Sequence, residues 1–131
     1  MTLRINSFFL AASFSILLLQ AHAQSPPTEI ERRLEKTWIV SGIEQDGQVL
    51  KPAQTDFVLI INSDHSAKQG MSPDGLISCS WSVNQSGDVL TIQDDEMHQQ
   101  FKMKIDLLTA NELVLHDSSN DGEVKIHYRA K

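Results

Sequence analysis

The chain has few features that could fix its fold covalently or place it in a membrane. It contains one cysteine in 131 residues, Cys79, so an intramolecular disulfide is impossible and stability must come from packing. Its 11 lysine and arginine residues stand against 17 aspartate and glutamate residues, which argues against nucleic acid and anionic membrane surfaces as partners. After residue 23 no apolar run reaches the roughly 20 residues that span a bilayer, so we expect no membrane insertion.

The sequence also lacks the motifs by which enzymes are commonly recognised. It has no nucleophile elbow, no zinc-protease helix motif and no phosphate-cradling glycine loop. An enzyme of another kind would need titratable groups that converge only in the folded chain. We therefore expect a protein without catalytic activity and without a cofactor.

The first 23 residues have the features of a signal peptide. Arg4 supplies a positive start, residues 8–19 are apolar, and residues 21–23 form an A-x-A cleavage signal. Gln24 follows at the position where a bacterial lipid-anchored protein has cysteine. Cleavage there leaves residues 24–131, which is the size of one domain. We expect export to the periplasm or the medium.

A short amphipathic helix is expected after the leader. Thr28 and Glu31 have the spacing of a capping box, in which each side chain accepts the other residue's backbone N–H. Ile30 and Leu34 are four residues apart and share one face, and the helix is expected to end near Thr37. Its apolar face needs a cover, and the open mouth of a barrel is the natural place for it.

From Trp38 onward the sequence alternates in short runs that end at Gly, Asn, Asp, Ser or Pro. We expect strands over residues 38–43, 57–61, 67–71, 76–83, 89–93, 99–107, 112–117 and 123–129. Such a meander can close into an all-β, eight-stranded antiparallel up-and-down β-barrel, whose interior is packed solid or holds one small ligand. The longest connection, residues 44–56, is expected to fold over a mouth or to move.

Alternation assigns the large apolar side chains to the barrel interior. Seven of them are predicted to line a ligand site: Trp38, Phe57, Trp81, Phe101, Met103, Leu113 and Tyr128. The ligand would be a small apolar or amphipathic molecule, with the Tyr128 hydroxyl and the indole N–H groups orienting its polar end. The alternative is a packed barrel that binds a protein partner on its outside, around Val58, Ile60 and residues 48–56.

Two histidines invite a metal hypothesis. His116 and His127 fall on the outward face of strands expected to be neighbours, and they could hold zinc or copper if Asp117 or Glu123 joined them. The other interpretation is two solvated surface histidines, because a metal site needs three or four convergent ligands.

Two further features have a structural and a functional interpretation. The segment from Asp117 to Asp121 begins like a calcium loop, but Tyr128 stands where the bidentate glutamate should be, which favours a plain hairpin turn. Cys79 shares a face with Trp81 and has no histidine or basic residue beside it in the sequence. A buried thiol is therefore favoured over a reactive one.

Much of the chain resembles small secreted bacterial lipocalin-like domains, in which a short N-terminal helix runs into a Trp-bearing first strand. The resemblance is carried by residues 34–40, 80–83, 87–88, 90–92, 101–107 and 108–115, together with Tyr128. That family usually has glycine two residues before each tryptophan, where this chain has Lys36 and Cys79. The resemblance implies an up-and-down barrel open at one end, with small-molecule binding as the default activity and no particular ligand.

Overall fold

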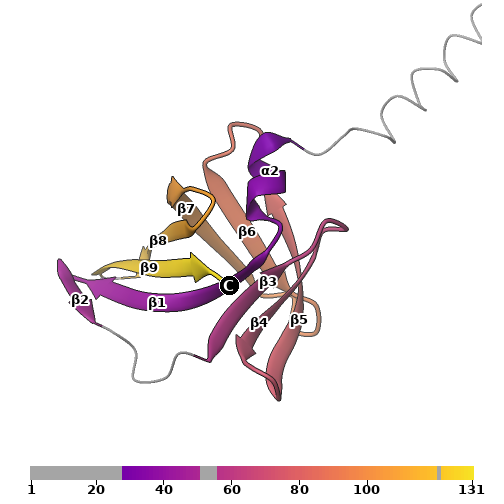
Figure 1. The fold of residues 1–131 in the computed structure, drawn as a ribbon, viewed down its shortest axis with the longest axis horizontal. Helices are drawn as coiled ribbons and strands as arrows, with labels where there is room; N and C mark the ends of the chain where they lie inside the picture. The colour runs from indigo at the N-terminus through magenta and orange to yellow at the C-terminus, as the bar shows by residue number, and fades with distance from the viewer. Residues whose placement is uncertain (1–27, 51–55, 121) are drawn as a thin grey trace, which may run out of the picture.

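The computed structural model describes residues 28–50, 56–120 and 122–131, with the side chains of residues 118–120 left aside. The predicted signal peptide, residues 1–23, lies outside them. The described chain forms one antiparallel sheet that closes on itself, with a short helix at one end (Figure 1). The elements are the helix α2 (Glu29–Leu34) and the strands β1 (Thr37–Gln45), β2 (Gln48–Leu50), β3 (Phe57–Ile61), β4 (Ser66–Met71), β5 (Gly75–Val83), β6 (Val89–Asp94), β7 (Gln100–Leu108), β8 (Glu112–Asn120) and β9 (Gly122–Ala130).

The predicted up-and-down barrel is confirmed. Strands β3 to β9 pair antiparallel in chain order, and β1 pairs with both β3 and β9, which closes a ring of eight strands. Each of the eight predicted runs is a strand whose ends lie within three residues of the predicted ends. Alternating residues and local turn residues therefore located the strands correctly.

Strand β2 was not predicted, and it corrects the expectation of one long connection over residues 44–56. Asp46 and Gly47 both have positive φ, 51° and 83°, which is typical of a two-residue hairpin turn. The turn folds β2 back on β1, so that Gln45 pairs with Gln48 and Ile43 with Leu50. Three residues are too few for alternation to reveal a strand. The remainder of the connection, residues 51–55, lies outside the described residues.

Helix α2 begins with the predicted capping box and ends at Leu34, three residues earlier than predicted. The Glu31 backbone N–H donates to Thr28 Oγ1 at 3.2 Å, and the Thr28 N–H donates to Glu31 Oε1 at 3.3 Å. A helix of six residues is not stable alone, so tertiary packing must hold it. Among the described residues, no helix has the length and apolarity needed to cross a bilayer.

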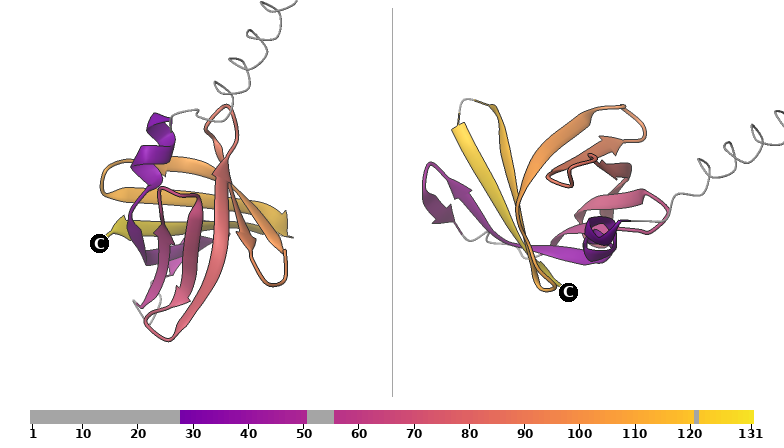
Figure 2. Two further views of the ribbon diagram at one scale, coloured as in Figure 1. Left: turned by 90° about the vertical axis from the view of Figure 1, so that its right-hand side faces the viewer. Right: turned by 90° about the horizontal axis from the view of Figure 1, so that it is seen from above.

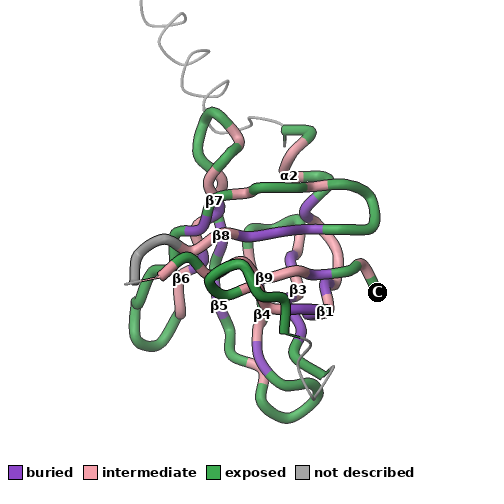
Figure 3. Tube along the Cα trace, turned by 90° about the vertical axis from the view of Figure 1, so that its left-hand side faces the viewer, coloured by how far each residue is buried: buried purple, intermediate pink, exposed green. Residues whose placement is uncertain are grey.

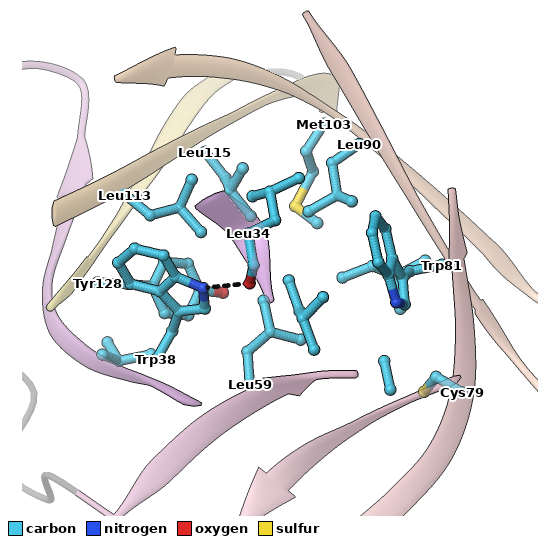
Figure 4. Packing of buried hydrophobic residues seen from close by; sticks show 14 residues of the cluster. Leu34, Trp38, Leu59, Cys79, Trp81, Leu90, Met103, Leu113, Leu115 and Tyr128 are labelled. Atoms are coloured by element: carbon cyan, nitrogen blue, oxygen red, sulfur yellow. Dashed lines mark hydrogen bonds between the residues drawn. The ribbon is translucent and has the colours of Figure 1, made fainter. Parts of the chain in front are cut away.

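The helix covers one end of the barrel, as predicted, and it does so through Leu34. This side chain is fully buried at the centre of the hydrophobic core (Figure 4). The Trp38 indole Nε1–H donates a 3.0 Å hydrogen bond to the Leu34 carbonyl oxygen, which ties the helix to the first strand. The core therefore lies at the helix end.

Away from the helix the barrel wall separates along two seams. The ladder between β7 and β8 joins residues 104–108 to residues 113–116, and that between β1 and β3 joins residues 37–39 to residues 58–60. Beyond these pairs the strands diverge, so that β8 and β9 point away from β6 and β7 (Figure 2). The β4–β5 hairpin at this end is exposed throughout its turn (Figure 3). The barrel therefore has a covered end and an open end.

Candidate ligand site at the open end of the barrel

Five of the seven predicted ligand contacts lie in the packed core. Trp38, Trp81, Met103, Leu113 and Tyr128 are all buried and belong to one hydrophobic cluster (Figure 4). Burial also raises the pKa of the Tyr128 hydroxyl, so this group stays protonated at any physiological pH. These side chains stabilise the helix end, and direct contact between them and a ligand stays a prediction.

The other two predicted contacts, Phe57 and Phe101, lie at the open end and remain accessible. Phe57 is 36 % exposed and Phe101 is 39 % exposed. Phe57 alternates with Leu59 and Ile61, which are buried in the core, and Phe101 alternates with buried Met103. Because successive side chains point to opposite faces of a strand, both phenylalanines are on the inward face.

Two further apolar side chains that the sequence analysis did not single out complete this surface. Met71 is 38 % exposed and pairs with Phe57, and Ile77 is 48 % exposed and pairs with Gln69. We call Phe57, Met71, Ile77 and Phe101 the open-end cup. The signal for Ile77 was available, because it alternates with Cys79 and Trp81, whereas Met71 ends a strand whose other residues are mostly small or polar.

Two carboxylates occupy inward positions at the same end. Asp94 follows the buried Leu90 and Ile92 on β6 and pairs with Cys79, and Asp117 follows Leu113 and Leu115 on β8. Both are half-buried. Asp94 Oδ1 accepts the Glu96 N–H at 2.8 Å and the Met97 N–H at 3.2 Å, so it also caps the β6–β7 turn.

Cys79 is buried behind the cup, in agreement with the interpretation as a structural thiol. Burial raises the pKa of this thiol, and the negative charges of Asp94 and Asp95 raise it further. A protonated, buried thiol is a poor nucleophile. The structure thus offers no activated cysteine at this end of the barrel.

A cleft opens beside the cup where β7 and β8 separate. It has a volume of about 300 Å³ and is lined by Gln100, Phe101 and Lys102 of β7 and by Asp117 of β8. Phe101 and Asp117 face inward by alternation, whereas Lys102 pairs with Thr91 on the outward face. The wall of the cleft therefore contains an aromatic ring, which also belongs to the cup, together with a carboxylate and a lysine.

A larger groove lies outside the covered end. It measures about 590 Å³ and runs between α2 and the β7–β8 turn, lined by Glu29, Arg32, Arg33, Lys36, Leu108, Thr109 and Ala110. Lys36 Nζ donates to the Ala110 carbonyl at 3.0 Å, and Arg33 pairs with Glu29 at 3.1 Å. The Arg33–Glu29 pair lies within α2, and the hydrogen bond from Lys36 to Ala110 attaches the residues after the helix to the β7–β8 turn.

The two histidines each have a carboxylate partner of their own, neither of them the predicted one. His116 Nδ1 lies 3.7 Å from Asp106, which also binds Lys125 at 3.3 Å, and His127 Nε2 lies 3.3 Å from Glu44. The described residues contain no group of three or more His, Cys, Asp or Glu side chains that could hold a metal. The predicted zinc or copper ligand set is therefore not assembled here.

Two other predicted surfaces lie partly outside the described residues. The segment from Asp117 to Asp121 includes side chains that the structure does not describe, so the calcium hypothesis stays untested. On the predicted outer surface Val58 is buried and Ile60 half-buried. Of the described residues of that surface, Val49 is 60 % exposed and Leu50 is 56 % exposed, and both belong to β2.

These features define a lipocalin-like β-barrel with a covered end and an accessible apolar interior at the other end. The structure is similar to the crystal structure of a lipocalin-like protein from Bacteroides uniformis ATCC 8492, with a TM-score of 0.60 and 15 % sequence identity over 76 % of this chain and 99 % of that one. It is also similar to an uncharacterized protein from Bacteroides eggerthii DSM 20697, with a TM-score of 0.57 and 12 % identity over 73 % of this chain and 98 % of that one. No protein-family model and no curated protein sequence matches the chain. At these identities the likeness establishes the fold, and fold alone does not determine a ligand.

Proposed function

We propose that this protein is exported and that it binds a small apolar or amphipathic molecule in the open-end cup. The observation that carries the proposal is the exposure of four large apolar side chains at inward positions of the barrel, 36 to 48 % in each case. An accessible, concave apolar surface is the usual form of a small-molecule site. Covering about 200 Å² of it, at about 25 cal/mol per Å², would contribute about 5 kcal/mol before the cost of association.

The mode of action we propose is sequestration. The cup has no activated thiol, and its large side chains are apolar, so the interior can shelter a molecule from water. Export is supported by the signal-peptide features of residues 1–23. Intact-mass measurement of the protein recovered from the periplasm or medium tests it: a chain that begins at Gln24 is expected, and an intact Met1 would contradict it.

The ligand proposal is tested by titrating the protein with Nile red, a neutral probe that fluoresces in apolar surroundings. Phe57→Ser and Phe101→Ser are each expected to weaken binding about tenfold, with little change in stability because both side chains are already partly exposed. Val49→Ser is the matched control, since Val49 is exposed on β2, outside the closed ring. Equal binding by all four proteins would refute the proposal.

A protein partner that docks on β2 is the second candidate. The exposed Val49 and Leu50 favour it, because apolar side chains at a strand outside the barrel can bind another chain. Under this alternative Val49→Ser abolishes capture of the partner, whereas Phe57→Ser and Phe101→Ser leave it intact. Native mass spectrometry of the protein from its own exported fraction distinguishes the two, since a small bound mass supports the cup and a bound protein supports β2.

A further inference from the structure

We infer that the ligand carries a positive charge, with its apolar part in the open-end cup and its cationic group beside Phe101 and Asp117. This inference rests on the proposed function, because it names the chemical class that the same site would accept. Three features favour a cation: the sign of the charges that face inward, the aromatic ring between them and the cleft that opens next to that ring.

Apolar and acidic side chains share the inward positions around the open end. Following the register from strand to strand, the inward side chains nearest this end are Phe57 on β3, Met71 on β4, Ile77 on β5 (next to Gly75, which has no side chain), Asp94 on β6, Phe101 on β7, Asp117 on β8, Val124 on β9 and Gln45 on β1. Among the described residues, the charged side chains at inward strand positions are Asp94 and Asp117. The inward side chains at this end are therefore mostly apolar, and those that carry a charge are acidic.

Phe101 lies on the strand between those of the two carboxylates. Asp94 and Asp117 belong to the strands on either side of β7, and Asp117 lines the same cleft as Phe101. The face of an aromatic ring attracts cations, and a carboxylate adds a charge-assisted hydrogen bond to an ammonium group. The two together discriminate a cation from a neutral or anionic group.

Lys102 and Lys125 lie toward this end of β7 and β9, and both occupy outward positions. Lys102 pairs with Thr91, and Lys125 pairs with Glu44. Lys125 binds Asp106 at 3.3 Å, whereas Lys102 lines the same cleft as Phe101 and Asp117. An anionic amphiphile such as a fatty acid would have to bring its carboxylate toward Asp94 and Asp117, and the repulsion would oppose binding. The charge pattern thus favours an amine or quaternary ammonium compound with an apolar body.

Acidic side chains also act on Cys79, which is buried next to the cup residue Ile77 on β5. Asp94 and Asp95 add to the effect of burial in raising the pKa of the Cys79 thiol, as expected where negative charges disfavour a thiolate. The same field would stabilise a bound cation.

The test compares three probes with equal twelve-carbon tails: dodecyltrimethylammonium, dodecanol and dodecanoate. Each is titrated below its micelle concentration against the full exported protein, and displacement of Nile red is measured. We expect the cation to bind at least tenfold more tightly than dodecanoate, with dodecanol between them. The preference should shrink as salt is added, because salt screens partly exposed charges.

Variants assign the preference to the site. Asp117→Asn is expected to reduce the preference for the cation about tenfold, and Lys102→Gln is expected to increase it. Glu123→Gln is the matched control: it removes the same charge from an exposed residue beside Val124, but on the outer face of β9. Asp94→Asn is a second variant, since its amide oxygen can still accept the backbone N–H groups of Glu96 and Met97.

The outcomes separate the two proposals. Preference for the cation that falls in Asp117→Asn and persists in Glu123→Gln supports the inference. Equal or tighter binding of dodecanoate, or identical behaviour of Asp117→Asn and Glu123→Gln, overturns the inference and leaves apolar binding in the cup standing. Failure of all three probes, with Nile red binding unaffected in Phe101→Ser, overturns both.

Discussion

Replacing Leu34 by alanine tests whether helix α2 holds the covered end of the barrel together. Leu34 is fully buried at the centre of the core, on a helix too short to form alone. A buried Leu→Ala substitution costs about 3 to 5 kcal/mol through lost apolar transfer and the cavity left behind. A domain of this size has about 5 to 15 kcal/mol of total stability, so the loss would lower the melting temperature by roughly 10 to 20 °C.

The assay is urea denaturation followed by tryptophan fluorescence and by circular dichroism. Both tryptophans, Trp38 and Trp81, are buried, so fluorescence reports the core directly. We expect a lower midpoint with an unchanged slope, because stability and not the unfolded surface area changes. Acrylamide should also quench the Leu34→Ala protein more than the parent protein, since Trp38 donates its indole N–H to the Leu34 carbonyl.

Arg33→Ala is the matched control on the same helix. Its side chain is 52 % exposed, so a change within about 0.5 kcal/mol is expected. A Leu34→Ala protein as stable as Arg33→Ala, with tryptophans no more accessible to acrylamide, would refute the assignment of α2 as the cover of the barrel.

Three further predictions concern the backbone, the thiol and the acid range. Gly70→Ala should destabilise the protein by more than about 2 kcal/mol in urea denaturation, because Gly70 has a φ of 135° and an added Cβ would collide with the Gly75 carbonyl. Gly47→Ala, with open space around it, should cost only the strain of its positive φ, about 1 kcal/mol. Equal costs for the two substitutions would contradict this prediction. Cys79 should resist alkylation at pH 7 in the folded protein and react at once in urea, and rapid labelling of the native thiol would be inconsistent with its burial and raised pKa. Hydrogen bonds from neighbouring side chains lower the pKa of Asp88 below the ordinary 3.8, so its contribution to stability is present above that pH and is lost as the pH falls through the lowered value. The difference in stability between the parent protein and Asp88→Asn should therefore vanish in strong acid. A difference that does not change with pH would disprove this prediction.

Much of the fold could be predicted from the sequence because its signals are local. Alternation of apolar and polar residues depends on neighbours two positions apart, and turns depend on residues such as Asp46 and Gly47 that tolerate positive φ. The capping box of Thr28 and Glu31 lies within four residues. The strands predicted from alternation and the capping box are confirmed by the structure. The strand β2 was missed because three residues carry too little pattern.

Alternation failed where a bulge interrupts it. Between Ile105 and Leu107 the register of β7 against β8 shifts, so Leu107 is 41 % exposed and the next residue, Leu108, packs against the core. A similar shift in β1 between Val40 and Gly42 leaves Ile43 packed against the core. Alternation alone does not locate these positions, because a bulge depends on how a strand pairs with its neighbour in the sheet.

Outside the two bulges, the sequence by itself determined which side chains face inward, and the tertiary structure decided which of those are covered. Phe101 and Met103 lie on the same strand and the same face, yet Phe101 is 39 % exposed and Met103 is buried. The difference arises because the ladder between β7 and β8 begins at Lys104 and His116, so the wall is closed beside one residue and open beside the other. Where two strands separate depends on the closure of the whole ring, and on the helix that fills one end of it. The candidate site is therefore a property of the closed barrel, and periodicity alone could not locate it.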